Sequence, residues 1–324
     1  MEVLKEACDF LSEGDKFLLT THRNADGDGL ASLLACGMLM RRMGKSYLMV
    51  VSDPIPEGRY SFLPGFPEIL SCQGSLPWCP ERAVVLDTPN LERLGDATEL
   101  LPEARHVLNV DHHEDNVFFG SINLVLPEAS STCEILYLIF SSLGLPLDGD
   151  VALCIYTGIA FDTGGFRFSN TTSEALHIAG DMVELGVRPD EVADALFHRR
   201  SPEAIRRLAE ALSSLEFYCG GKVGMISLDD VTSEGTSEDT EGFVDMVLFV
   251  DGVEVAAFLR RVDGGSFRVS LRSRGGVPVN KIAGRFGGGG HPRAAGCYVH
   301  GDICEAKSRI LEAIREAVTG CSGT

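Results

Sequence analysis

Short apolar runs alternate with helical patterns through the first half of the chain. Four of these runs are apolar throughout instead of alternating with polar residues, which indicates strands buried on both faces. They occupy residues 17–21, 47–51, 83–87 and 106–111. The stretch 29–44 has a helical spacing and ends in basic residues and a glycine, as helix C-termini often do. We therefore expect an α/β fold in which a parallel sheet is flanked by helices.

Helical patterns follow this sheet. We expect helices over residues 132–143, 151–161, 173–186 and 190–216. The last of these contains the sequence SPEAIRRLAEALSSLEFY, in which a serine precedes a proline at the first turn.

After about residue 217 the pattern changes, because glycine becomes frequent and strand-like stretches dominate. The expected strands there are 222–228, 253–262 and 266–273. They indicate a second, smaller α/β domain. We expect the first domain to span residues 1–190, a helical linker 191–216 and the second domain 217–324.

The charge balance limits the partners of the chain. Its 47 acidic and 28 basic residues give a formal net charge of −19. This excess of negative charge opposes tight binding to long nucleic acid, so any nucleic-acid substrate is expected to be short. The acidic segment 229–242 is expected to be a solvated loop that leads into a helix.

The cysteines and the apolar stretches indicate the cellular compartment in which the protein is expected. The ten cysteines lack the closely spaced pairs of a zinc ribbon, so we expect free thiols in a reducing environment. The start of the chain lacks the pattern of a signal peptide, and the most apolar stretch, residues 30–40, is too short to span a bilayer. We expect a cytoplasmic protein with no membrane partner.

Aspartate and histidine gather at, or just after, the ends of predicted strands and of one helix. They lie in residues 21–32 (THRNADGDGLAS), at Asp87, in 110–115 (VDHHED) and in 157–166 (TGIAFDTGGF). Each alone has an ordinary explanation, since aspartates also cap helices and turns. Ligands of open α/β sheets bind at the carboxyl ends of the strands, so the joint occurrence favours one shared metal site.

Charge arithmetic favours two metal ions. Asp26, Asp28, Asp87 and Asp162 would bring four negative charges together, which repulsion and desolvation oppose unless cations neutralise them. Two divalent ions cancel that charge. Carboxylates with a few imidazoles and no thiolate suit Mn²⁺ best, with Mg²⁺ as the alternative. Paired ions of this kind catalyse phosphoester hydrolysis by activating water and holding the phosphoryl group.

These residues resemble the successive motifs of the DHH phosphoesterase superfamily in order and spacing. The matching motifs are His-x-Asn-x-Asp-x-Asp at residues 22–28, the lone Asp87, the Asp-His-His of residues 111–113 and Asp162. The resemblance implies six metal ligands: His22, Asp26, Asp28, Asp87, His112 and Asp162. It also implies that His113 contacts the phosphate and assists the departing oxygen, and that Asp111 accepts a hydrogen bond from a ligating imidazole.

The motif departs from the family at two positions. Ala25 stands where the family usually has proline, and Ala31 where it has glycine. Both replacements are small, so we expect them to tune metal affinity without abolishing it.

The segment 268–297 concentrates glycine and arginine within an acidic chain. Arg272 and Arg274 can pair with phosphate, although a glycine hairpin with solvated arginines would give the same composition. Its GGGGHPRAAG run resembles the GGGH signature of the DHH-associated C-terminal domain. That resemblance implies substrate binding by Arg272, Ser273, Gly288, Gly289, Gly290 and His291. Asn280 and Arg285 are weaker candidates, because the first suits a helix cap and the second a solvated position.

The two-domain organisation is similar to that of nanoRNases and pAp phosphatases of this superfamily. We do not expect its 324 residues to accommodate the extra nucleic-acid-binding domain of RecJ exonucleases, and the GGGGH run is not expected in the lysine-rich second domain of family II pyrophosphatases. The resemblance implies hydrolysis of short RNA oligonucleotides to 5′-mononucleotides, of 3′-phosphoadenosine 5′-phosphate to AMP, or both. A soluble phosphodiesterase for cyclic or linear dinucleotides is the alternative, and a nucleotide sensor without activity is a further one. The resemblance also makes a homodimer plausible.

Overall fold

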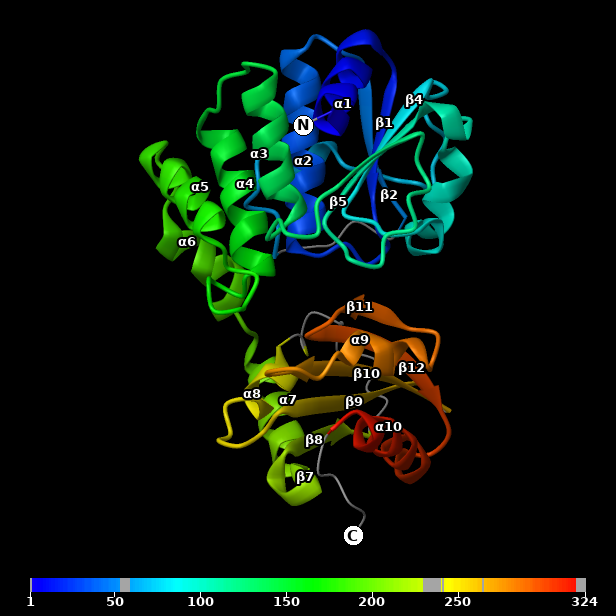
Figure 1. The fold of residues 1–324 in the computed structure, drawn as a ribbon, viewed down its shortest axis with the longest axis vertical. Helices are drawn as coiled ribbons and strands as arrows, with labels where there is room; N and C mark the ends of the chain where they lie inside the picture. The colour runs from blue at the N-terminus through cyan, green and yellow to red at the C-terminus, as the bar shows by residue number, and fades with distance from the viewer. Residues whose placement is uncertain (1, 53–58, 230–239, 241, 264, 319–324) are drawn as a thin grey trace. The chain divides into compact units, whose positions relative to one another are not determined.

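The computed structural model describes residues 2–52, 59–229, 240, 242–263 and 265–318. The chain divides into two compact units, Met1–Arg199 and Arg200–Thr324 (Figure 1). Each unit is built on its own six-stranded sheet, which confirms the predicted fold class. Helix α7 (Pro202–Ser213), which lies in the range expected as a linker, belongs to the second unit by its contacts.

The first unit holds the predicted parallel sheet, in the order β3-β2-β1-β4-β5-β6. Its strands are β1 (Phe17–Thr21), β2 (Tyr47–Val51), β3 (Leu70–Ser71), β4 (Arg82–Leu86), β5 (Val107–Asp111) and β6 (Ile122–Val125). Every residue of β1 and β5 is buried. Leu19 packs in the main core and Leu18 in a smaller cluster on the opposite face. Burial on both faces explains why these strands are apolar throughout.

Helices of the first unit within residues 27–184 follow the predicted ones closely, whereas the first helix of the chain was not predicted. The helices of this unit are α1 (Glu2–Glu13), α2 (Gly27–Arg42), α3 (Thr132–Ser142), α4 (Gly149–Asp162), α5 (Ser173–Glu184) and α6 (Pro189–Ala193). Side chains of Asp26, Ser131, Asp148 and Thr172 accept backbone N–H groups at the starts of α2, α3, α4 and α5. Such N-caps set where each helix begins.

The expected continuous helix over 190–216 is wrong. The chain forms α6, a π-helical turn (Asp194–His198), helix α7 (Pro202–Ser213) and strand β7 (Glu216–Tyr218). Ser201 has an extended backbone and caps α7, and Pro202 occupies its first turn. Proline disfavours a helical conformation in the residue before it and lacks an N–H, so the helix restarts there.

The second unit has a mixed sheet in the order β11-β12-β10-β9-β8-β7. Its further strands are β8 (Val223–Leu228), β9 (Val255–Asp263), β10 (Ser266–Ser273), β11 (Gly289–His291) and β12 (Ala294–His300). Its further helices are α8 (Phe243–Val247), α9 (Val279–Gly284) and α10 (Ile303–Ala317).

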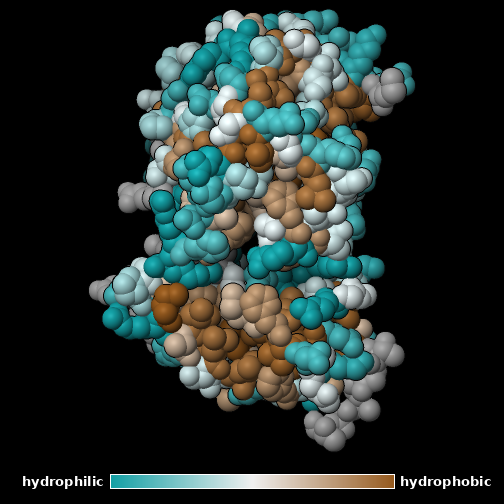
Figure 2. All heavy atoms as spheres, turned by 90° about the vertical axis from the view of Figure 1, so that its left-hand side faces the viewer, coloured by the Kyte–Doolittle hydropathy of each residue, from teal (hydrophilic) through white to brown (hydrophobic). Residues whose placement is uncertain are grey.

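The two faces of this second sheet differ. Phe267, Val269 and Leu271 of β10 pack with α9 and α10 in one core, while residues between them along the strand are only half-buried. The face opposite to that core is covered in part by α7 and α8. Figure 2 shows a hydrophobic area on the surface of this unit. Exposed apolar and aromatic residues of the unit as a whole include Ile205, Phe217, Phe249 and Tyr298.

Other expectations have mixed outcomes. Residues 230–239 and 241 of the acidic segment lie outside the described residues. Eight described cysteines are free thiols, whereas Cys219 is disulfide-bonded, so the expectation of free thiols is wrong at that position. No helix in the described ranges is long and apolar enough to cross a membrane.

Candidate metal centre

Asp26 lies at the N-terminus of α2, directly after β1. It is the N-cap of that helix, and its Oδ1 accepts the backbone N–H groups of Asp28 and Gly29 at 3.2 and 3.1 Å. A Cβ at Gly29 would lie 2.8 Å from Oγ1 of Thr21 and 3.2 Å from Nε2 of His22. Glycine is therefore needed for α2 to begin so close to the end of β1, and the helix start carries both aspartates into the site.

His22 is buried just after β1. Its Nδ1 lies 2.9 Å from the carbonyl oxygen of Arg23, so Nδ1–H donates there and Nε2 is the atom directed at the carboxylates. Nε2 lies 3.7 Å from Oδ1 of Asp26 and 3.5 Å from Oδ2 of Asp87. Burial lowers the pKa of His22, but hydrogen bonding to Asp26 and Asp87 outweighs it and raises that pKa to about 10. A proton and a metal ion are thus alternative partners for these carboxylates.

Asp87 follows β4 and lies at the centre of the cluster. Its backbone is in the left-handed region, at φ 53°, a conformation that aspartate tolerates better than most residues. Its buried carboxylate has Oδ1 3.5 Å from Nε2 of His112 and 3.7 Å from Nδ1 of His113. Burial raises the pKa of Asp87, but hydrogen bonding to His112 and His22 holds it well below its ordinary value. This aspartate is therefore a carboxylate shared among three imidazoles.

Asp28 is completely buried and is held by the N-terminus of α3. Its Oδ2 accepts the backbone N–H of Thr132 at 2.6 Å, and its Oδ1 accepts that of Cys133 at 3.1 Å. The hydroxyl of Thr132 also donates to Oδ1 of Asp87 at 3.2 Å. Burial, reinforced by the charges of Asp87 and Asp162, raises the pKa of Asp28 well above its ordinary value. The N–H donors of Thr132 and Cys133 leave no signal in the sequence, because they belong to the backbone.

His112 and Asp162 face each other from two different elements. Nε2 of His112 lies 3.0 Å from Oδ2 of Asp162, the last residue of α4, and Nδ1 lies 3.3 Å from the carbonyl oxygen of Ala129. Burial raises the pKa of Asp162 to about 6, against the opposing effect of His112. Burial lowers the pKa of His112, but Asp162 and Asp87 outweigh it and raise that pKa well above its ordinary value.

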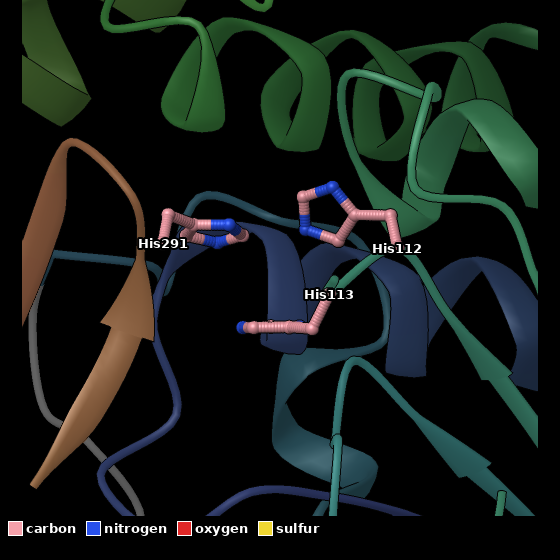
Figure 3. Close-up of side chains that lie close together, drawn as sticks. All are labelled: His112, His113 and His291. Atoms are coloured by element: carbon pink, nitrogen blue, oxygen red, sulfur yellow. The ribbon is translucent and has the colours of Figure 1, made fainter. Parts of the chain in front are cut away.

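Asp111 pairs with His113 and not with His112, the residue between them. Nδ1 of His113 lies 2.7 Å from Oδ1 of Asp111, whose Oδ2 accepts the side-chain amide of Asn116 at 2.6 Å. The expectation that Asp111 orients the ligand His112 therefore differs from the geometry, because residues two apart in extended chain point the same way. Figure 3 shows the two imidazoles on the loop after β5, with ring centroids 5.1 Å apart and planes at 71°.

The donor atoms of this cluster fit a divalent cation. Among the described residues of the first unit, three groups have ligand atoms that all lie within 4.8 Å of one another: His22, Asp26 and Asp87; Asp28, Asp87 and His112; Asp87, Asp111 and His113. The donors are carboxylate oxygens and imidazole nitrogens, the set preferred by Mn²⁺ and related ions. Asp87 belongs to all three groups, so one carboxylate can serve two neighbouring ions.

The predicted substrate residues of the second unit make contacts within that unit. Arg272 forms an ion pair with Asp245 of α8, with Nε 3.1 Å from Oδ1. Ser273 is buried and donates its hydroxyl to the carbonyl oxygen of Val277 at 2.7 Å, which closes the turn after β10. His291 lies on β11 (Figure 3). Of the two weaker candidates, Arg285 pairs with Glu316 of α10, and Asn280 accepts the N–H of Lys281 next to it.

The glycine run is required by the hairpin of β11 and β12. A Cβ at Gly288 would lie 2.1 Å from the carbonyl oxygen of Gly296, and one at Gly290 would lie 2.5 Å from that of Ala294. Gly290 also has φ 133°, which L-residues rarely adopt. Gly289 lies between them on β11. Close packing of two backbones accounts for these glycines before any ligand is considered.

Two protein-family models match the chain. "DHH family, N-terminal domain" matches residues 16–159, and "DHHA1 domain" matches residues 220–320. The chain is also 35% identical to "Bifunctional oligoribonuclease and PAP phosphatase NrnA" of Thermus thermophilus, over 93% of this chain and 90% of the relative. The chain belongs to the DHH family. This family of phosphoesterases is metal-dependent, in agreement with the donor set described above.

Further relatives and solved structures are also similar to this chain. A protein of the same name from Bacillus subtilis is 27% identical, over 88% of this chain and 90% of the relative. Among solved structures, an exopolyphosphatase-related protein from Bacteroides fragilis is 25% identical and matches with a TM-score of 0.88, covering 97% of this chain and 96% of that one. RecJ from Thermus thermophilus matches with a TM-score of 0.51 at 16% identity, over 97% of this chain and 52% of RecJ, and shows a common fold.

Proposed function

We propose that this chain is a two-metal phosphoesterase that hydrolyses short oligoribonucleotides to 5′-mononucleotides and 3′-phosphoadenosine 5′-phosphate to AMP. The observation that carries the proposal is Asp87, a buried carboxylate common to two neighbouring donor groups. The substrate class is supported by relatives over most of this chain that are named oligoribonuclease and PAP phosphatase.

The proposed ligands form two sets joined by Asp87. His22 and Asp26 would hold one ion, and Asp28, His112 and Asp162 the other. Mn²⁺ is the proposed physiological ion, because the set mixes imidazole with carboxylate. Two such ions, when bound, activate water and hold the phosphoryl oxygens. The role of the protein is to keep six ligand side chains fixed, five of them largely out of solvent and Asp26 partly exposed, so that little reorganisation is needed on binding substrate.

His113 is the proposed general acid. Its Nδ1–H is committed to the carboxylate of Asp111, so the proton exchanged with substrate is held on Nε2. Asn116 fixes Asp111 in turn, through its amide at 2.6 Å. This chain of hydrogen bonds sets the orientation of the imidazole. Protonation of the departing ribose oxygen from Nε2 would complete the cleavage.

The second unit is proposed to bind the nucleotide next to the scissile phosphate. Arg272 is the main candidate, since a substrate phosphate can replace the carboxylate of Asp245 as its partner. His291 and the glycine hairpin would contribute a ring and exposed backbone. A cytoplasmic location and a homodimer remain predictions from the sequence.

A substrate panel tests the proposed function. The purified protein with Mn²⁺ is offered 3′-phosphoadenosine 5′-phosphate, a five-nucleotide RNA, a twenty-four-nucleotide RNA and cyclic di-AMP, with products identified by chromatography. AMP from the first and mononucleotides from the second, with much slower turnover of the long RNA, are expected. Preferred cleavage of cyclic di-AMP would replace this proposal with the phosphodiesterase alternative. Asp87→Asn protein prepared in parallel controls for contaminating nucleases, and binding without turnover would indicate a sensor.

A further inference from the structure

Two arginines lie directly opposite each other in the sheet of the second unit. Arg268 of β10 pairs in register with Arg260 of β9, and on its other side with Tyr298 of β12. Directly opposed residues share a face of the sheet, with Cβ atoms about 5 Å apart. The three residues therefore form a row across the adjacent strands β9, β10 and β12.

This row lies on the face of the sheet opposite α9 and α10, which α7 and α8 cover in part. Phe267 and Val269, on either side of Arg268 along β10, point into the core with those helices, so Arg268 points the other way. Both arginines are half-buried, while Tyr298 is 53% exposed. The row is thus accessible from solvent at its aromatic end and partly desolvated at its cationic end.

The two arginines lack the carboxylate partners that their neighbours have. Arg261 pairs with Asp229, and Arg272 pairs with Asp245. Within the described residues, the side chains of Arg260 and Arg268 form no ion pair or hydrogen bond. Like charges directly opposed across a strand pair are destabilising. Burial, together with the charges of Arg268 and Arg207, lowers the pKa of Arg260. In a chain with a net charge of −19, this concentration of positive charge suits an external anion.

The row is continuous with the proposed position of the first nucleotide. Arg268 and Arg272 lie four residues apart on the same face of β10, about 14 Å at the usual rise of a strand. Ser270 lies between them, opposite Gly296 of β12. The neighbour of Ser270 on the β12 side is therefore small, and a nucleotide chain can lie against the sheet there, whereas on the β9 side Ser270 lies opposite the buried Phe258.

We propose that Arg260, Arg268 and Tyr298 form a distal subsite that binds an oligoribonucleotide beyond the nucleotide held at Arg272. The guanidinium groups would bind a backbone phosphate, and the tyrosine ring would stack on a base, the combination typical of single-strand recognition. This inference rests on the proposed function. It implies that substrates too short to reach the row are cleaved without its help.

Steady-state kinetics on two substrates test the subsite. Arg268→Gln and Arg260→Gln are each expected to raise KM for a five-nucleotide RNA about tenfold, and to lower the dependence of log(kcat/KM) on log salt by about 0.7. Tyr298→Leu is expected to raise the same KM about tenfold, and Tyr298→Phe is expected to restore it because the ring is retained. Turnover of 3′-phosphoadenosine 5′-phosphate should change less than about twofold in all four variants, because a single nucleotide ends short of the row.

Arg206→Gln is the matched control, since it removes one cation from an exposed ion pair on α7 of the same unit. If the arginine variants cleave the five-nucleotide RNA with unchanged KM and salt dependence, the subsite is refuted. An equal loss on both substrates would also refute it, because the row would then act on the unit as a whole. Failure of the proposed function has a different signature, in which the wild-type protein cleaves neither substrate.

Discussion

The backbone N–H of Thr132 donates to the carboxylate of Asp28 at 2.6 Å, across 104 residues of chain. The hydroxyl of the same threonine donates to Asp87 at 3.2 Å. One residue at the start of α3 therefore fixes Asp28, a proposed ligand of one ion, and Asp87, the carboxylate proposed to be shared by both. Because the N–H belongs to the backbone and the hydroxyl to the side chain, the two contacts can be separated by mutation.

Thr132→Val removes only the hydroxyl and keeps the N–H and the shape of the side chain. We expect the affinity for Mn²⁺ to fall about tenfold, because Asp87 loses a partner that orients it. Calorimetric titration of metal-free protein measures this without reference to activity. Thr132→Ser should restore the affinity. If Thr132→Val binds Mn²⁺ as tightly as the wild type, the hydroxyl has no part in orienting Asp87.

Asp28→Asn is expected to separate activity from stability. Burial and nearby carboxylates raise the pKa of Asp28, so its ionised form is disfavoured in the metal-free fold. The amide oxygen can still accept an N–H from α3. We expect hydrolysis to fall by at least about a hundredfold, whereas Tm of the metal-free variant should equal or exceed that of wild type. A lower Tm in scanning calorimetry would show that the negative charge itself stabilises the fold.

Metal binding is expected to release protons. His22 has a pKa of about 10 in this arrangement, above its ordinary value of 6.5, so the metal-free imidazole is protonated at neutral pH. An imidazole must lose that proton to ligate a metal. The heat of Mn²⁺ binding should therefore vary with the ionisation enthalpy of the buffer, and affinity should rise with pH up to about 10. Equal heats in phosphate and Tris buffers would contradict this.

The same shift predicts the opposite trend for stability without metal. A pKa raised on folding stabilises the native state fully below 6.5, and that contribution is lost as the pH rises through about 10. Metal-free protein should therefore lose stability across this interval. Urea unfolding in the presence of a chelator measures the trend, and the His22→Gln variant should lack the part due to this imidazole.

Gly288→Ala is expected to destabilise the second unit. The added Cβ would lie 2.1 Å from the carbonyl oxygen of Gly296, so β11 and β12 would have to move apart. We expect a loss of about 2–3 kcal/mol in the free energy of unfolding, as for other overpacked sites. Gly284→Ala is the control, because its Cβ would meet no atom within 4 Å. Equal stability of the two variants would show that the hairpin adapts without cost.

The sequence was most informative where one rule governs many residues. Parallel strands buried on both faces leave continuous apolar runs, and their carboxyl ends meet at one edge. Strand β4 and the position of Asp87 could therefore be predicted together. The helix expected over residues 190–216 is interrupted at Ser201. Ser201 and Pro202 signal the start of a new helix there, although they lie inside the range expected for one continuous helix. The serine cap and the proline end one helix and begin the next, although the helical pattern continues on both sides of them.

What escaped prediction depends on contacts between distant segments. The amides of Thr132 and Cys133 carry no signal in their side-chain types, since any residue has an N–H. The pairing of Asp111 with His113 follows from strand geometry. From the sequence alone, however, His112 is an equally good partner for Asp111, because it is the adjacent residue. Short strands such as β6 were missed because four residues leave little pattern to recognise.

The left-handed backbone of Asp87 limits how this centre can be altered, by evolution or by design. At φ 53°, glycine, asparagine and aspartate are the residues best accommodated, and of these only aspartate carries a negative charge. A longer acidic side chain such as glutamate would meet a backbone penalty before it reached any cation. Asp87→Asn is therefore expected to preserve the turn and to remove the shared negative charge. This variant is the natural basis for an inactive form of the protein that retains bound substrate.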